Sequence, residues 1–281
     1  MEHAGTERTG LFFTEMHTPG AGLVLKVTRT LVHKRTKFQE LAVLETAEFG
    51  RMLVLDGCVM LTERDAFIYH EMLVHPALMF LRGKATEVAV IGGGDGGTVT
   101  ELVKYPEIKK ILLVEIDPEV VAAAREFLPE VAAGLADPRV EVHHQDGFKF
   151  LQSHEHEFNL IFIDSPDPVG PAEVLYTEEF YRRAKGALRP GGLLALQSES
   201  PWYQRALVKQ IYGNLKAIFA QVRLYLAHIP TYPGGVWAFA LASDQELRRN
   251  ERPLPGGLRY LNEEMLSHLF ALPEYLRHEL D

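Results

Sequence analysis

Acidic residues follow several apolar runs of this sequence at positions where a ligand would bind. The first is Asp95, which lies in the stretch Gly92-Gly93-Gly94-Asp95-Gly96-Gly97 directly after Val90-Ile91. Glycine-rich turns that join a strand to a helix normally bind anions, because backbone N–H groups and the positive end of the helix dipole point into the turn. Asp95 adds a fixed negative charge there, which favours a ligand with a cationic group, such as an amine.

A second acidic residue, Glu115, has the spacing of a nucleoside ligand. Gly92, Gly94 and Gly97 satisfy the G-x-G-x-x-G pattern of dinucleotide-binding turns, which is a weak signal on its own. Glu115 lies 23 residues after Gly92, near the spacing at which an acidic side chain binds both hydroxyls of a ribose. A module that binds NAD and a methyltransferase that binds a nucleoside both fit these residues. A solvated carboxylate at a strand end is the alternative.

A third acidic residue, Asp146, follows the next apolar run in the sequence Gln145-Asp146-Gly147. A carboxylate at this point can accept a hydrogen bond from an exocyclic amine such as N6 of adenine, and Gly147 lets the backbone approach the ring. Three acidic strand ends favour enzymes of adenosyl-sulfonium compounds over NAD enzymes. An ordinary Asp-Gly turn is the alternative.

Two further carboxylates, Asp164 and Asp167, lie three residues apart in the stretch Asp164-Ser165-Pro166-Asp167-Pro168-Val169-Gly170-Pro171. Hydride transfer has little use for such a pair. An enzyme that acts on a protonated amine has two uses, because one carboxylate anchors a charge and the other accepts a proton. The prolines and the glycine predict a loop that orders over a ligand. Asx turns before proline are the alternative for each aspartate.

The elements that must position these residues alternate between strands and helices from residue 87 onward. The predicted strands are Glu87–Ile91, Ile111–Glu115, Val140–His143, Leu160–Ile163 and Leu193–Gln197, and the predicted helices are Thr98–Lys104, Pro118–Leu128, Glu178–Ala187 and Gln204–Phe219. This alternation predicts an α/β fold with a doubly wound, Rossmann-like parallel sheet of the methyltransferase type. Its ligand is expected at the carboxyl ends of the strands.

The N-terminal residues have a different pattern, that of short strands joined by tight turns. The predicted strands include Gly22–Arg29, Leu41–Thr46, Arg51–Leu55 and Cys58–Leu61, with Asp56-Gly57 as the turn between the last two. We therefore expect two domains. Residues 1–62 form a small N-terminal antiparallel β domain, and residues 63–281 form the Rossmann-like catalytic domain.

The composition narrows the class of function. With 29 basic and 38 acidic residues the net charge is −9, which argues against nucleic acid or an anionic membrane as the main partner. The hydrophobic share of 47% suits a protein with a sizeable core, yet no apolar run reaches the roughly 20 residues that span a bilayer. Cys58 is the only cysteine, which excludes an internal disulfide and a thiolate metal site. The N-terminus lacks the apolar segment of a signal peptide, so a cytoplasmic enzyme is expected.

Together these residues make the chain similar to the polyamine aminopropyltransferases, the spermidine synthase family. The similarity spans roughly residues 10–275. It is carried by Gly92–Gly97, Glu115–Asp117, Asp146-Gly147, the Asp164–Pro171 loop and Ile229-Pro230-Thr231-Tyr232, and upstream by Phe38–Leu41, Leu55–Gly57, Thr62–Asp65 and Tyr69–Glu71.

The resemblance implies decarboxylated S-adenosylmethionine as the aminopropyl donor, a co-substrate rather than a cofactor, and a diamine as the acceptor. It also implies a homodimer or homotetramer that needs no metal. The glycine turn, with Gly92 and Gly94, belongs to the donor site. Among the other residues that match the family's motifs, Gln39, Glu115, Asp146, Gly147 and Pro171 match donor-binding positions, while Tyr69, His70, Asp95, Asp164, Asp167 and Tyr232 match the amine channel, with Asp164 at the position of the general base.

The chemistry of such a transfer fits these residues. The sulfonium donor carries its own leaving group, so the obstacle is the acceptor amine, which has a pKa of about 10 and is protonated at neutral pH. Asp164, assisted by the Tyr69 hydroxyl, would remove one proton, while His70 and acidic groups farther along the channel hold the other amine. Asp95 would attract the donor ammonium and repel the carboxylate of intact S-adenosylmethionine, or else face the acceptor amine.

The expected reaction converts putrescine into spermidine, with methylthioadenosine as the second product. Agmatine, cadaverine or a longer amine remains open as the acceptor, because channel walls set the acceptor length. A methyltransferase that uses intact S-adenosylmethionine and a catalytically silent adenosyl-binding protein are alternatives of other classes. One departure from the family is Pro166, where a small polar residue is usual, and it leaves acceptor preference in doubt.

Overall fold

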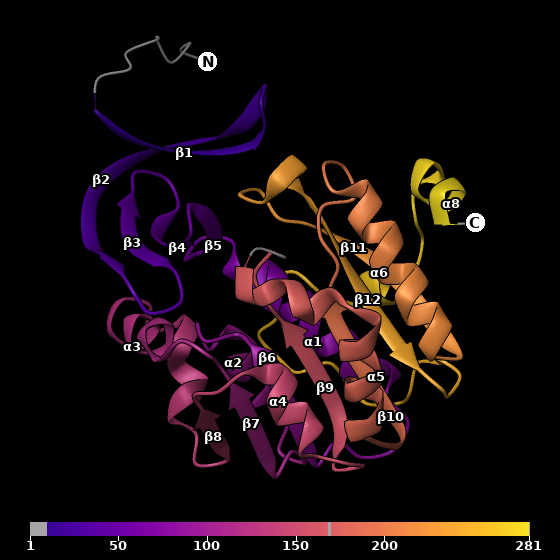
Figure 1. The fold of residues 1–281 in the computed structure, drawn as a ribbon. Coiled ribbons are helices and arrows are strands. Elements are labelled where there is room, and N and C mark those ends of the chain that lie inside the picture. Colours follow the sequence, from indigo (N-terminus) through magenta and orange to yellow (C-terminus); the bar gives the residue numbers. More distant parts are fainter. Residues whose placement is uncertain (1–9, 168–169, 281) are drawn as a thin grey trace.

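The computed structural model describes residues 10–167 and 170–280, which form two β-sheets with helices packed around the second (Figure 1). The first sheet is antiparallel throughout, and its strands follow one another in chain order. They are β1 (Leu11–Thr18), β2 (Ala21–Arg35), β3 (Glu40–Thr46), β4 (Gly50–Leu55) and β5 (Cys58–Thr62). The predicted antiparallel N-terminal sheet is therefore confirmed. We propose that the boundary between the two domains lies after residue 62.

The second sheet has the strand order β11-β12-β10-β9-β6-β7-β8. Its strands are β6 (Glu87–Gly92), β7 (Lys110–Val114), β8 (Val140–His143), β9 (Phe158–Asp164), β10 (Leu188–Gln197), β11 (Gln221–His228) and β12 (Val236–Ser243). Strands β6 to β10 are parallel, which confirms the Rossmann-like core. The sequence did not predict β11 and β12. Strand β12 runs antiparallel to both β10 and β11, so the sheet is mixed rather than fully parallel. The short segment between β11 and β12 is enough to join them, because antiparallel neighbouring strands need no crossover helix.

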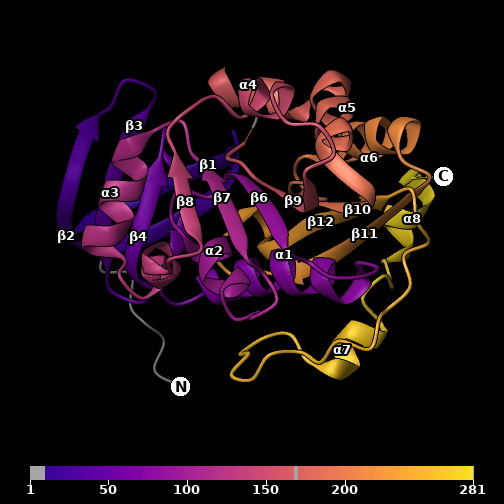
Figure 2. The ribbon, with the colours of Figure 1, turned by 90° about the horizontal axis from the view of Figure 1, so that it is seen from below.

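Helices cover both faces of the second sheet (Figure 2). One face carries α1 (Ala66–Phe80), α2 (Gly97–Leu102) and α3 (Pro118–Phe127), and the other carries α4 (Gly147–Gln152), α5 (Glu178–Ala187) and α6 (Arg205–Ile218). Each face of the sheet has its own hydrophobic core, and successive residues of β6 point to opposite faces. Val88 and Val90 pack in the core on the α1 side, whereas Ala89 and Ile91 pack in the core on the α4–α6 side. The remaining short helices are η1 (Val131–Ala136), η2 (Gly170–Tyr176), η3 (Pro233–Gly235), α7 (Glu263–Ser267) and α8 (Glu274–Leu280). Within the described ranges no helix is both long enough and apolar enough to cross a membrane.

Helix α1 is buried on nearly all sides, which fixes the residues it contributes to the site. The sheet and α2 cover it, and the buried Glu71 carboxylate accepts three backbone hydrogen bonds from residues 259–261. Pro76 lies inside the helix and cannot donate to the carbonyl of Met72. The Tyr225 hydroxyl donates to that carbonyl instead, at 2.8 Å, so the helix continues through the proline without an unsatisfied group.

The turn between β2 and β3 is held against the second sheet at the start of α3. Asp117 caps α3 by accepting from the backbone N–H of Glu119. Its other oxygen accepts from the Thr36 hydroxyl at 2.7 Å and from the Gln39 amide at 3.0 Å. Lys34 and Glu119 form an ion pair across the same contact. The first sheet therefore presents Gln39 to the carboxyl end of β7.

Candidate active site

The carboxyl ends of the parallel strands bring four predicted site residues to one edge of the sheet. Gly92 ends β6 and lies in register with Asp164, which ends β9. Glu115 follows β7 directly, and Asp146 lies three residues after β8. These residues lie at neighbouring strand ends, because β6 lies between β9 and β7 in the sheet. This is the edge of a parallel sheet at which ligands are expected to bind.

The glycine-rich turn is built so that backbone lies against backbone. Gly92, Gly93 and Gly96 all have φ between 69° and 83°, and Gly93 N–H donates to the carbonyl of Asp164 at 2.8 Å. A Cβ on Gly92 would overlap that carbonyl oxygen, and a Cβ on Gly94 would lie 2.7 Å from Glu115 Cγ. The absence of side chains at these positions therefore brings β6, β9 and Glu115 together.

Replacing Gly92 by alanine will disrupt this turn. The variant combines a strained positive φ with the overlap on Asp164, so we expect a loss of more than about 2 kcal/mol of unfolding free energy, together with most of the activity. Urea unfolding monitored by fluorescence measures the first and turnover the second. The matched control is Gly186→Ala in α5, where a Cβ meets nothing within 4 Å. A Gly92→Ala protein as stable as the wild type contradicts the argument.

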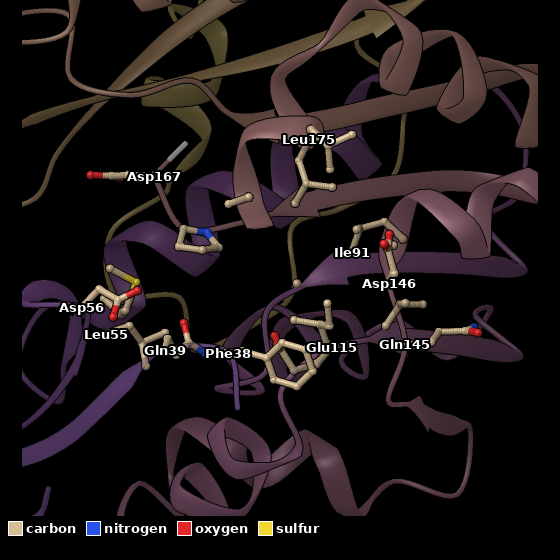
Figure 3. Close-up of a pocket in the computed structure, with 18 of the residues that line it drawn as sticks. Phe38, Gln39, Leu55, Asp56, Ile91, Glu115, Gln145, Asp146, Asp167 and Leu175 are labelled. Carbon is tan, nitrogen blue, oxygen red and sulfur yellow. The ribbon is translucent and has the colours of Figure 1, made fainter. Parts of the chain in front are cut away.

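The largest cavity at this edge, which we call the large cavity, has a volume of about 260 Å³ (Figure 3). Figure 3 shows Gln39 and Phe38 on one side of it and Asp146 with Ile91 on the other. The residues predicted for the donor that line it are Gln39, Gly92, Glu115, Asp146 and Gly147. Gly94 lies instead in the neighbouring cavity, and Pro171 belongs to η2, with its side chain outside the described part of the chain.

Two carboxylates of the large cavity are held by backbone N–H groups. Glu115 accepts from Asp117 N–H at 2.9 Å and from Gly94 N–H at 3.2 Å. Burial nevertheless raises the pKa of Glu115 to about 7. Asp146 caps α4 by accepting from Phe148 N–H at 2.8 Å through Oδ1. Gly147 must lack a side chain, because a Cβ there would overlap Ile91.

A second cavity, the central cavity, is lined by Tyr69, His70, Asp95, Asp164 and Tyr232 among others. Asp164 is its most constrained carboxylate: Tyr69 OH donates to Oδ1 at 2.7 Å, and Thr98 Oγ1 donates to Oδ2 at 2.6 Å. Burial raises the pKa of Asp164 above its ordinary value, and the negative charge of Asp95 raises it further. A carboxylate in this condition is a stronger proton acceptor than a solvated one.

Asp95 and His70 form an ion pair in the wall of the central cavity. His70 Nε2 lies 3.2 Å from Asp95 Oδ1, which also accepts from Gly97 N–H at 2.7 Å. Burial disfavours both charges, but their mutual attraction outweighs it, so the pKa of His70 is raised and that of Asp95 is lowered. His70, Asp95 and Asp164 each place one side-chain nitrogen or oxygen within 4.8 Å of the others.

A third cavity, the acidic cavity, contains residues that the sequence did not single out. Tyr69, Asp167 and Tyr232 were predicted here, but the wall also includes Glu15 from β1 and Gln197 from the end of β10. Glu15 is buried and accepts from Val59 N–H at 2.9 Å. Burial raises the pKa of Glu15 to about 7.

Glu199, two residues after β10, completes the acid cluster behind this cavity. It is 1% exposed and has φ of 72°, an unfavourable conformation for a residue with a side chain. Its Oε1 accepts from Tyr176 OH at 3.3 Å and from the Gln197 amide at 3.3 Å. Burial and the charge of Asp167 raise the pKa of Glu199 well above its ordinary value. The sequence held one usable signal, an acidic residue after a predicted strand, as at Glu115.

Two known families match adjoining segments of the chain. The family described as "Spermine/spermidine synthase domain" matches residues 66–251, and the family described as "Spermidine synthase tetramerisation domain" matches residues 11–63. A polyamine aminopropyltransferase of Caldicellulosiruptor bescii is 44% identical over 273 residues, covering 95% of this chain and 97% of the relative. That of Moorella thermoacetica is 44% identical, with 97% of each chain covered.

Solved structures give the same result in three dimensions. A spermidine synthase in complex with the transition state analogue AdoDATO superposes with a TM-score of 0.93 at 35% identity, covering 97% of this chain and 96% of that one. The spermidine synthase from Thermotoga maritima gives a TM-score of 0.92, also at 35% identity, covering 97% and 95%. The chain therefore belongs to the spermine/spermidine synthase family and is a transferase of the polyamine aminopropyltransferase group.

Proposed function

We propose that the protein transfers the aminopropyl group of decarboxylated S-adenosylmethionine to putrescine, giving spermidine and methylthioadenosine. One observation carries the proposal: Asp164 lies in the central cavity, which shares walls with both the large and the acidic cavity. A nucleoside in the large cavity and an amine in the acidic cavity would meet at this carboxylate. The comparisons support the reaction class, since a relative that superposes closely binds AdoDATO.

The large cavity has the groups that an adenosyl donor needs. The backbone N–H groups of Gly94 and Asp117 donate to Glu115, which would also accept hydrogen bonds from the ribose hydroxyls. Those hydroxyl donors would favour the ionised form of Glu115. Asp146 uses Oδ1 for the cap of α4, which leaves Oδ2 for N6 of adenine. Gln39 would close the cavity from the first sheet. Pro171, whose side chain lies outside the described part of the chain, stays a predicted donor-binding residue.

The transfer itself needs one proton acceptor and an aligned pair of reactants. The acceptor nitrogen attacks the propyl carbon attached to sulfur, the carbon–sulfur bond breaks, and its electron pair leaves with the neutral thioether of methylthioadenosine. Asp164 takes the proton that the attacking nitrogen releases. Tyr69 would hold Asp164 and the nitrogen in line, since alignment contributes at least as much as proton transfer.

The acidic cavity would bind the far ammonium of the diamine. Glu15 and Asp167 line it, Glu199 lies behind it, and burial raises the pKa of all three carboxyl groups. An ammonium group would balance the charge of these groups where they ionise. The aromatic walls formed by Tyr232 and Trp237 suit the apolar chain between the two amines.

Acceptor binding will depend on pH through Glu15. Because its pKa is raised to about 7, Glu15 is neutral below that value and attracts an ammonium only above it. The KM for putrescine should therefore fall about tenfold between about pH 6 and about pH 8. In Glu15→Gln the KM should be higher at the upper pH and nearly flat, whereas the control Glu48→Gln, an exposed acid of the same sheet, should behave as wild type. Equal pH slopes for Glu15→Gln and wild type would remove Glu15 from the acceptor site.

The proposal is tested by an acceptor panel of putrescine, cadaverine, agmatine and spermidine with the decarboxylated donor, using mass spectrometry to identify products. Spermidine and methylthioadenosine formed fastest from putrescine support it, and a chelator in the assay should change nothing. Faster turnover of another amine changes the acceptor and keeps the chemistry. Methyl transfer from intact S-adenosylmethionine with no aminopropyl product overturns the proposal.

We also propose a homodimer or homotetramer assembled through the first sheet. Support comes from the family match over residues 11–63 and from the exposed apolar side chains of Leu11, Met16 and Val24 on β1 and β2. Light scattering of the purified protein measures the assembly directly. A cytoplasmic location remains a prediction.

A further inference from the structure

Thr98 makes a contact that the fold of its helix does not require. It lies in the first turn of α2, is fully buried, and directs its hydroxyl away from its own helix to Oδ2 of Asp164 on β9. A valine would fill the same space, as Val99 does beside it. The hydroxyl group is therefore the part of Thr98 that needs an explanation.

The glycine-rich turn encloses Oδ2 of Asp164 on one side. The oxygen lies against Gly93, where a Cβ would be only 2.7 Å away, so bulk water does not reach it from that side. Within residues 10–167 and 170–280, Thr98 supplies the one hydrogen bond to Oδ2, while Tyr69 occupies Oδ1. A buried carboxylate oxygen without a donor is costly, and more so when a second negative charge is near.

The groups that face Asp164 include charges of both signs. Tyr69 and His70 come from α1, Asp95 comes from the glycine-rich turn, and Glu115 and Tyr232 line the same cavity. Asp95 opposes the charge of Asp164, while His70 is already engaged by Asp95. Hydrogen bonds to Asp164 must therefore supply much of what keeps it ionised.

We propose that Thr98 is a positioning residue for the base: its hydroxyl holds Oδ2, keeps Asp164 ionised beside Asp95, and fixes the carboxylate plane toward the acceptor nitrogen. The inference rests on the proposed function, in which Asp164 accepts the proton. A hydroxyl suits this role because it both donates and accepts. It can donate to the carboxylate before the transfer and accept from the carboxylic acid afterwards.

The test compares Thr98→Val, Thr98→Ser and Thr100→Val in the full chain. Thr100 lies on the same helix and is half-buried, and its hydroxyl bonds to the backbone of Val131 and Gly134, so it controls for the loss of a hydrogen-bonded hydroxyl from this helix. We expect Thr98→Val to shift the acidic limb of the pH profile of kcat/KM for putrescine to higher pH by about one unit. At pH values below the shifted limb, kcat should be about tenfold lower than in the wild type. The donor KM should stay within about twofold, because no donor contact is removed.

Serine keeps the hydroxyl, so the acidic limb of the kcat/KM profile of Thr98→Ser should lie at the wild-type pH. The limb of Thr100→Val should also lie there, even if the Tm of that variant is lower. A Thr98→Val profile that superposes on the wild type overturns the inference, as does an equal shift in Thr98→Ser.

A second measurement does not depend on turnover. The difference in Tm between wild type and Thr98→Val should widen as pH rises and Asp164 ionises, since only the charged form needs the donor. A difference that stays constant with pH contradicts the role of Thr98. Absence of turnover by the wild type with every amine would overturn the proposed function alone, and the Tm series would still decide on Thr98.

Discussion

Asp164→Asn will lower kcat by about 10²–10⁴-fold while the affinity for methylthioadenosine stays nearly unchanged. Asparagine keeps the volume of the side chain and one oxygen that can accept from Tyr69 or Thr98. It cannot take a proton from an ammonium at neutral pH. The rate of methylthioadenosine release measures kcat. Calorimetric titration with methylthioadenosine measures the affinity of the site that binds the aminopropyl donor.

The comparison with Asp167→Asn separates the base from an anchor. Asp167 borders the large and acidic cavities but not the central one, so its loss should raise the KM for the diamine more than it lowers kcat. If Asp164→Asn retains wild-type turnover, or if both variants change only KM, Asp164 is not the proton acceptor.

Asp95→Asn will relax the rejection of intact S-adenosylmethionine by about 10²-fold, because like charges brought together cost several kcal/mol. The wild-type carboxylate stays ionised, since burial is outweighed by His70, which lowers the pKa of Asp95. It would repel the carboxylate that distinguishes the intact compound from the true donor. The ratio of the inhibition constant of S-adenosylmethionine to the KM of the decarboxylated donor measures this selectivity.

Removing Asp95 also leaves His70 without its partner at 3.2 Å, so some loss of turnover will accompany the change in selectivity. Glu101→Gln is the matched control, because Glu101 is a largely buried acid on α2 that pairs with His75 and Lys104 outside the cavities. An unchanged ratio in Asp95→Asn, or an equal change in Glu101→Gln, removes the repulsion argument.

The parallel part of the fold could be predicted because β6, β7 and β9 are short apolar runs that end at, or directly before, a glycine or an acidic residue. Val140–His143 and Glu178–Ala187 have the predicted bounds, and the other strands and helices differ at their ends. Strand β12 was missed because it is buried along most of its length and has no alternating pattern. Strand β11 was also missed, although exposed and more buried residues alternate over Gln221–Leu224.

The predicted site residues came from strand ends and from family motifs, so they cover the large and central cavities well. The acidic cavity was harder. Glu15 and Glu199 lie 184 positions apart, and only the packing of β1 against the loop after β10 brings them near one cavity. Nothing in the local sequence of either residue indicates the other. Thr98 was missed for a different reason, because a threonine in a helix is ordinary until its hydroxyl partner is known.

The first sheet supplies groups to both reactant cavities, Gln39 to the large one and Glu15 to the acidic one. With the proposed function, the segment that matches a tetramerisation family would also contribute to substrate binding. A chimera that exchanged residues 11–63 between relatives would then exchange acceptor preference along with assembly. Selection for a new polyamine could act on the β1–β2 hairpin and leave the sheet that carries the base unchanged.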